Sequence, residues 1–189
     1  MNRLVHALMF IIPYIWGSDL MKARNLGIFF GILAVLIVLL VVLNNAGNDK
    51  DTVYGVPKKD LYPETRALLN DKNYDNIILP NELDRMIADK KSFFVYYFSA
   101  SCSHCKFTTP KIKPIVDELG INFHEFNLLE YQNYLGKMNI NATPTLVYYK
   151  DGVEAERMEG GLKEAANTVG YTLDDFRTFF DKYKPSGND

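Results

Sequence analysis

The sequence predicts an α/β domain, with a central mixed β-sheet flanked by helices, preceded by an N-terminal transmembrane helix. Three observations support this prediction. Residues 92–99, SFFVYYFS, form a continuous apolar run typical of a strand buried on both faces. Strand-like and helix-like segments alternate from residue 76 to residue 183. Residues 26–43 form an uncharged apolar run of 18 residues, which is long enough to cross a membrane.

Length and composition limit the possible architectures and partners. The 189 residues suit one folded domain with appendages, and a hydrophobic content of 48% is sufficient for a packed core. The net charge is −2, without a basic cluster of the kind that binds nucleic acid. We therefore expect no nucleic-acid partner.

Residues 1–25 are expected to form a cytoplasmic or extension segment ahead of the membrane span. The apolar patch at residues 4–16 is too short to span comfortably and contains Pro13. Met21 directly precedes Lys22 and resembles the start of a signal anchor. The sequence favours residues 1–20 as an upstream extension, with Met21 as an alternative start.

The run at residues 26–43 is either an uncleaved signal anchor or a cleaved signal peptide. A cleaved signal has an apolar core of about 7–15 residues followed by a small-residue cleavage site. Here the core is longer and runs into VVLNNAGN, which offers no good small-x-small site. The sequence therefore favours an anchor. Lys22 and Arg24 abut its N-terminal end, which favours a cytoplasmic N-terminus and an extracytoplasmic domain.

Residues 44–75 are polar and contain Pro57 and Pro63, which predicts a stalk or linker that packs loosely on the domain. The domain is predicted over residues 76–185. It begins with a short strand at 76–79, and Asn81 is expected to cap a helix over 82–91. The buried strand at 92–99 follows.

The remaining elements are predicted from periodicity and end signals. A helix over 106–120 is expected to end at Gly120. The predicted elements that follow are a strand at 121–128, a helix or helix-turn at 130–140, and strands at 145–150 and 153–161 joined by an Asp151-Gly152 turn. Thr172 and Asp175 have the spacing of a capping box at the start of the last helix.

The two cysteines of the chain, Cys102 and Cys105, stand two residues apart between a buried strand and a helix. Unpaired N–H groups in the first helical turn stabilise a thiolate, so the pKa of Cys102 is expected to fall below its usual range. The imidazole of His104 can favour the thiolate further. Cys105 lies one turn deeper and is expected to keep its proton until it attacks a mixed disulfide.

Three other uses of a cysteine pair fit the sequence less well. A zinc site needs about four ligands, and one CxxC supplies two. The other histidines are His6 and His124, so we predict no metal. A c-type haem site needs histidine directly after the second cysteine, where Lys106 stands. A structural disulfide here would close a very small loop and constrain little chain.

Several features in register with the cysteines resemble the thioredoxin fold over residues 76–183. Pro110 lies eight residues after Cys102, where thioredoxins have a kinking proline. Thr143-Pro144 resembles the cis-proline loop of the family, which lies against the active-site disulfide and holds substrate backbone. Gly160-Gly161 resembles its glycine-bearing turn. The resemblance implies redox chemistry through a reversible Cys102–Cys105 disulfide, without another cofactor, tuned by Ser103, His104, Thr143 and Pro144.

The sequence departs from cytoplasmic thioredoxins around this motif. They read WCGPC, whereas Ser101 stands here at the tryptophan position. They also have a buried acid in the preceding strand, where this chain has Tyr96. That acid exchanges protons with the deeper cysteine. Glu125 or another carboxylate is a candidate substitute, which the sequence alone does not place.

The expected function is that of a membrane-tethered thiol–disulfide oxidoreductase acting on exported protein or peptide thiols and disulfides. Cys102 attacks, Cys105 resolves, and a redox partner protein recycles the pair. Histidine in the CxxC and threonine before the proline resemble exported oxidases and isomerases, which favours that direction. An extracytoplasmic reductase is the alternative, and a docking or chaperone module with a passive disulfide is the non-enzymatic one.

Overall fold

The computed structural model describes residues 26–43, 52–165 and 169–184. The expectations for residues 1–25 and 44–51, including the choice between Met1 and Met21 as the start, lie outside the described residues. The chain divides into two compact units, residues 1–49 and 50–189. In the first unit, Leu26–Leu43 is one helix with a mean hydropathy of 3.3, long and apolar enough to cross a membrane.

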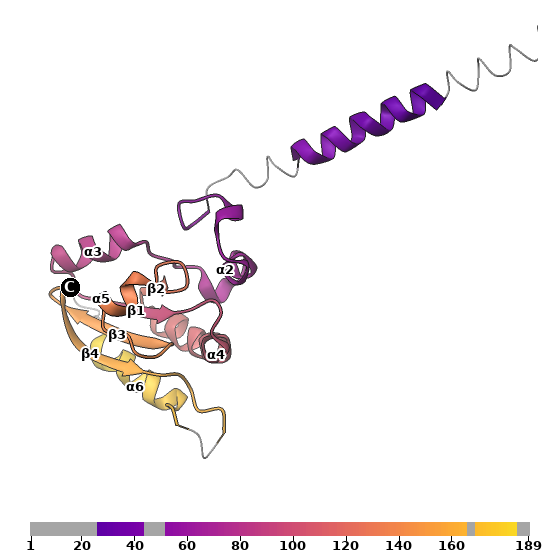
Figure 1. Cartoon of the computed structure of the whole chain (residues 1–189). Coiled ribbons are helices and arrows are strands. Elements are labelled where there is room, and N and C mark those ends of the chain that lie inside the picture. The colour runs from indigo at the N-terminus through magenta and orange to yellow at the C-terminus, as the bar shows by residue number, and fades with distance from the viewer. Residues whose placement is uncertain (1–25, 44–51, 166–168, 185–189) are drawn as a thin grey trace, which may run out of the picture. The chain divides into compact units, whose positions relative to one another are not determined.

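The second unit is built on one mixed sheet of four strands in the order β2-β1-β3-β4 (Figure 1). The central strand β1, Phe93–Phe98, pairs in parallel with β2, Phe123–Asn127. On its other side, β1 pairs antiparallel with β3, Thr145–Lys150, which pairs antiparallel with the edge strand β4, Val153–Glu159. All six residues of β1 are buried, as the apolar run predicts.

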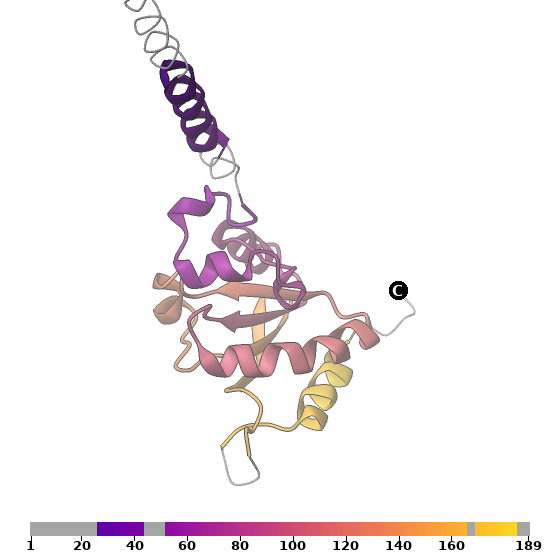
Figure 2. The same ribbon diagram turned by 90° about the vertical axis from the view of Figure 1, so that its right-hand side faces the viewer.

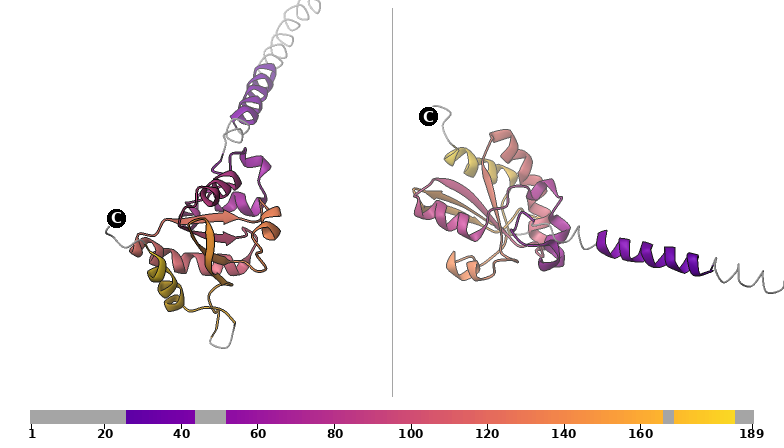
Figure 3. Two further views of the ribbon diagram at one scale, coloured as in Figure 1. Left: turned by 90° about the vertical axis from the view of Figure 1, so that its left-hand side faces the viewer. Right: turned by 90° about the horizontal axis from the view of Figure 1, so that it is seen from above.

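Four helices cover the two faces of this sheet. One face packs on α4, Ser103–Leu119, and α6, Leu173–Tyr183, as the ribbon turned by 90° shows (Figure 2). The other face packs on α3, Pro80–Ala88, and α5, Asn133–Lys137. The strands lie between these two helical layers in the further views as well (Figure 3). The predicted mixed sheet flanked by helices is confirmed.

Side chains of β1 alternate between two separate cores, because successive residues of a strand point to opposite faces. Phe94, Tyr96 and Phe98 join the core under α4 and α6, which also contains Cys105. Phe93, Val95 and Tyr97 join the core under α3 and α5. The register pairs Tyr96 with Glu125 and Phe98 with Asn127, so these β2 side chains share the face that carries α4.

Three of the predicted end signals are confirmed. Gly120 ends α4 in the left-handed conformation with φ 64°, which a glycine adopts without strain. Thr172 and Asp175 form the capping box of α6. Asp151 and Gly152, with φ 52° and 77°, form the turn between β3 and β4.

The start of the domain differs from the prediction. Residues 76–79 do not form a regular strand; Ile77 makes only an isolated bridge to Glu125. Helix α3 begins at Pro80, one residue before the predicted cap Asn81. Proline suits the first helical position, where its missing N–H is not needed, so Leu79 occupies the cap position without a side-chain bond. The early helix start leaves little room for a strand.

Residues 52–75 are also more closely packed than the loose stalk predicted for 44–75. They contain the helix α2, Pro63–Leu68, between short 3-10 turns at Lys58–Asp60 and Lys72–Tyr74. Four of their side chains are buried against the domain: Tyr54, Leu61, Thr65 and Tyr74. The domain therefore begins well before the predicted boundary at residue 76, because a few apolar and aromatic side chains anchor an otherwise polar segment.

Asn127 connects this segment to the sheet. Its side-chain amide donates to the hydroxyls of Tyr54 and Thr65, at 3.2 and 3.0 Å. Its carbonyl oxygen accepts from the backbone N–H groups of Ala100 and Leu129, at 3.2 and 3.1 Å. Asn127 is fully buried, and Ala100 lies two residues before Cys102. The same side chain thus holds both the N-terminal segment and the approach to the cysteines.

We expect N127A to lower the free energy of unfolding by about 2–4 kcal/mol, because it leaves buried donors and hydroxyls without partners. Urea unfolding of the full chain in detergent measures the change. N122A is the matched control, since Asn122 is exposed directly before the same strand, and it should cost under about 1 kcal/mol. Equal losses in the two variants would contradict the role given to Asn127.

Candidate functional site

Cys102 lies where the chain leaves β1 and enters α4. Its backbone N–H donates to the carbonyl of Ser99 at 3.0 Å, which closes a turn after the strand. Its extended backbone, with φ −76° and ψ 118°, makes it the N-cap of α4. The sulfur accepts a hydrogen bond from the Cys105 backbone N–H at 3.2 Å. A cysteine therefore occupies the position where serine or aspartate commonly satisfies a free N–H of the first turn.

Hydrogen bonds lower the pKa of Cys102 to about 5. The largest contribution comes from the Cys105 thiol, and the Thr143 side chain and the backbone N–H groups of Cys105 and His104 add to it. Partial burial opposes the shift but does not cancel it. At neutral pH the partly exposed sulfur is therefore mainly a thiolate, the nucleophilic form of cysteine.

Cys105 lies one turn into α4 and has a different environment. It is fully buried in the core that includes Tyr96, Phe98 and Ala100. Burial, with a further contribution from Cys102, raises the pKa of its thiol well above the usual range. The two cysteines of one motif are thus divided into an ionised, accessible sulfur and a protonated, buried one.

The loop before β3 approaches the cysteines from the other side. The Thr143–Pro144 peptide bond is cis, as the sequence predicts. The Cys102 thiol lies 3.4 Å from the Thr143 carbonyl oxygen, to which its protonated form donates. Ser103, the first residue of α4, is exposed beside them. The structure therefore brings together Cys102, Ser103, Cys105, Thr143 and Pro144, which are distant in sequence.

The ring of His104 pairs with Glu164, a contact that the sequence does not predict. Its ring Nδ1 lies 3.1 Å from a carboxylate oxygen of Glu164, and its backbone N–H contributes to the lowered pKa of Cys102. The ring rests on Gly161: a Cβ there would come within 2.5 Å of the ring carbon Cδ2. Glu164 was not predicted, because nothing in its sequence context indicates that the chain after β4 returns to α4.

A layer of buried hydroxyls lies behind Cys105. Thr109, one turn further along α4, donates to the Cys105 carbonyl at 2.8 Å. Its oxygen also lies 3.1 Å from the hydroxyls of both Tyr74 and Tyr96. Glu125 is fully buried on the same face of the sheet. Burial raises the pKa of its carboxyl group to about 8.

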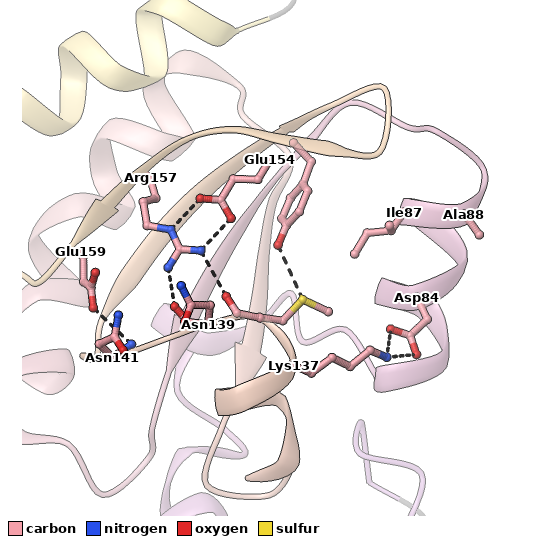
Figure 4. Close-up of a pocket in the computed structure, with 11 residues that line it drawn as sticks. Asp84, Ile87, Ala88, Lys137, Asn139, Asn141, Glu154, Arg157 and Glu159 are labelled. Atoms are coloured by element: carbon pink, nitrogen blue, oxygen red, sulfur yellow. Dashed lines mark hydrogen bonds and ion pairs between the residues drawn. The ribbon is translucent and has the colours of Figure 1, made fainter.

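An open hollow of about 820 Å³ lies elsewhere, between α3, the chain after α5 and the edge strand β4 (Figure 4). Arg157 in its wall pairs with Glu154, and Lys137 pairs with Asp84. No cysteine lines it, so it is separate from the cysteine site. Within the described residues, no group of three or more histidine, cysteine or acidic side chains is arranged to hold a metal ion.

Comparison with known proteins gives consistent matches to one family. Residues 67–169 match the thioredoxin family model. A thioredoxin of Mycoplasma genitalium is 30% identical over 80 residues, covering 42% of this chain and 78% of that protein. A probable protein disulfide-isomerase A4 of Caenorhabditis elegans is 26% identical over 138 residues, covering 72% of this chain and 20% of that protein. The solved structure of Malassezia sympodialis thioredoxin has a TM-score of 0.47 at 17% identity, covering 57% of this chain and 90% of that one.

The hydrogen bonds at Cys102 lead to a test of its ionisation. Alkylation of Cys102 by iodoacetamide should rise with pH through a midpoint near 5, the pKa of the thiol. C105A removes the donor with the largest effect, so the midpoint should move toward the ordinary cysteine value of about 8.5. C105S keeps a hydroxyl donor and should shift less.

S101A is the control, because the Ser101 hydroxyl bonds to the Ser99 hydroxyl and not to the sulfur. Its midpoint should equal that of the unmodified chain. A midpoint near 8.5 in the unmodified chain would show that the site does not stabilise a thiolate.

Proposed function

The chain belongs to the thioredoxin family of thiol–disulfide oxidoreductases, and we propose that it acts as a membrane-tethered oxidase or isomerase on exported proteins. The observation that carries this proposal is the difference between its two cysteines. Cys102 has a pKa lowered to about 5, while Cys105 is buried and remains protonated. Two sulfurs of opposite character within one helical turn suit the two successive steps of disulfide exchange.

The proposed oxidation begins with the Cys102–Cys105 disulfide. A substrate thiolate attacks the accessible Cys102 sulfur, the Cys102–Cys105 bond breaks, and its electron pair moves to Cys105, which takes up a proton. A second substrate thiolate then attacks the substrate sulfur of the mixed disulfide. The substrate leaves oxidised, and Cys102 leaves as a thiolate, which its hydrogen bonds stabilise.

The cis-proline loop is proposed to hold the substrate chain beside Cys102. The Thr143 carbonyl already lies next to the sulfur, in the loop directly before strand β3. An extended substrate segment lying along this loop would place its own sulfur against Cys102. Ser103 and His104 are exposed or half-buried at the same edge, where they can affect the substrate and the stability of the thiolate.

The proposed direction rests on the stability of the reduced form. Stabilising the Cys102 thiolate lowers the free energy of the dithiol and not that of the disulfide, so the pair becomes a stronger oxidant. Each ~1.4 kcal/mol of such stabilisation raises the reduction potential by about 30 mV. The histidine within the CxxC, resembling that of exported oxidases and isomerases, supports the same direction.

An extracytoplasmic reductase is the second candidate. It is favoured by the 30% identity to a protein named thioredoxin, which is higher than the 26% identity to a disulfide isomerase. In either direction the substrates are protein or peptide thiols and disulfides, and a redox partner protein must restore the starting state of the CxxC.

We further propose that Leu26–Leu43 is an uncleaved anchor and that the cysteines lie outside the cytoplasm. The helix is uncharged over 18 residues, and Lys22 and Arg24 precede it directly. The positive charges favour a cytoplasmic N-terminus. A single span then places the redox domain on the other side of the membrane.

The direction of electron flow is tested by the reduction potential of the full chain in detergent, equilibrated with glutathione redox buffers. We expect a value between about −200 and −120 mV, the range of isomerases and strong oxidants. A potential near about −270 mV, the thioredoxin value, would favour the reductase instead. C102A should abolish oxidation of a reduced, unfolded test protein, and activity retained in C102A would contradict the roles assigned to the pair.

The location is tested by labelling intact cells with a membrane-impermeant maleimide after mild reduction. We expect Cys102 to react, because it is accessible and ionised, and C102S to remain unlabelled although it keeps the buried Cys105. Labelling that appears only after the cells are lysed would place the domain in the cytoplasm. Recovery of the labelled chain in the membrane fraction should separate an anchor from a cleaved signal.

A further inference from the structure

The histidine between the two cysteines is held by a residue that lies outside the CxxC motif. A carboxylate oxygen of Glu164 lies 3.1 Å from the ring Nδ1 of His104. The Cys102 sulfur contacts the Thr143 carbonyl and the Cys105 backbone N–H instead. Among the described residues, no hydrogen bond joins the His104 ring to this sulfur. The ring is therefore committed to the carboxylate and not to the thiolate.

The backbone that carries Glu164 is fixed on both sides of the cysteine site. The Leu162 N–H donates to the buried hydroxyl of Thr108 in α4, at 3.0 Å. The Gly160 N–H donates to the carbonyl of Pro144 in the cis-proline loop, at 2.8 Å. The chain after β4 thus crosses from the cis-proline loop to α4, and these backbone bonds bring the carboxylate to the first turn of the helix.

Gly161 provides the space in which the His104 ring lies. A Cβ at residue 161 would come within 2.5 Å of the ring carbon Cδ2 and within 2.3 Å of the Thr108 hydroxyl oxygen. The backbone of Gly161 is not in the left-handed region, so the glycine is needed for close packing and not for its conformation. The sequence of this segment therefore accommodates the ring in its position beside Glu164.

The ring is able to leave this position without disturbing the core. The side chains of His104 and Glu164 are 34% and 53% exposed, and His104 belongs to neither core. The centroid of the neighbouring Phe107 ring is 6.3 Å from that of His104. A rotation of the His104 side chain toward Cys102 therefore requires no repacking of buried side chains.

Building on the proposed function, we propose that Glu164 is a positioning residue that competes with the Cys102 thiolate for the His104 ring and so limits the oxidising strength of the CxxC pair. An imidazole that donates to a thiolate, or carries a positive charge beside it, stabilises the thiolate. The ring gives less of this stabilisation while it is drawn to Glu164. The dithiol is then less favoured relative to the disulfide, and the reduction potential is lower than with a free ring.

The reduction potential of the full chain in detergent, equilibrated with glutathione, tests this role. Two glutathione thiols reduce the Cys102–Cys105 disulfide to the dithiol and form glutathione disulfide; Cys105 keeps its proton, and Cys102 releases its proton to water. E164A should shift the equilibrium constant toward the dithiol by about three- to tenfold, a rise in potential of about 15–30 mV. E164Q keeps an oxygen that can accept from the ring and should shift it less.

The same substitution in an H104A background separates positioning from the direct effect of the Glu164 charge on the thiolate. Because Glu164 acts through the ring, E164A should leave the potential of H104A unchanged. An equal rise with and without His104 would overturn the inference, and so would a potential that stays the same or falls in E164A alone. Failure of the unmodified chain to exchange disulfides with glutathione would instead overturn the proposed function.

Alkylation of Cys102 by iodoacetamide provides a second measurement. The midpoint in E164A should fall below the value near 5 expected for the unmodified chain, because the freed ring stabilises the thiolate. E118A is the matched control. It breaks another exposed ion pair of α4, that of Glu118 with Arg177 at 2.6 Å, near the end of the helix away from the cysteines. Both its midpoint and its potential should equal those of the unmodified chain.

Discussion

The hydrogen bond from the Cys105 backbone N–H to the Cys102 sulfur ties the start of α4 to the reactive atom, and the rest of the site depends on it. It requires Cys102 to be the N-cap, outside the helix, and therefore requires α4 to begin at Ser103. The same geometry places Cys105 one turn inside, facing the core. One local arrangement therefore fixes the exposure and the protonation of both sulfurs.

The surrounding fold keeps this helix start in place from three directions. Strand β1 fixes the path of the chain toward Cys102, because all of its side chains are buried. The side chain of Asn127 in β2 accepts a hydrogen bond from the Ala100 backbone N–H and donates to hydroxyls in residues 52–75, so it joins the two segments. The cis-proline loop lies against the Cys102 sulfur through the Thr143 carbonyl. The N-terminal segment thus contributes to the stability of the redox site although it lies far from the cysteines in sequence.

Much of this could be predicted from the sequence because the signals are local. The apolar run of β1, Gly120, the Thr172–Asp175 capping box and the cis bond at Pro144 all depend on neighbouring residues or on a family motif. The misplaced cap at Asn81 reflects two start signals one residue apart, of which Pro80 prevailed. The packing of residues 52–75 was missed because Asn127, which anchors them, is more than fifty residues away in the chain.

The contacts that tune the site could not be predicted for the same reason. The pairing of His104 with Glu164 depends on the chain after β4 returning to α4, and the burial of Glu125 depends on strand register. Tyr96 stands in β1 where thioredoxins have a buried acid, so β1 by itself offers no carboxyl group to exchange protons with the deeper cysteine. The register shows a buried carboxyl group, Glu125, directly opposite on β2, which the sequence of β1 alone does not reveal.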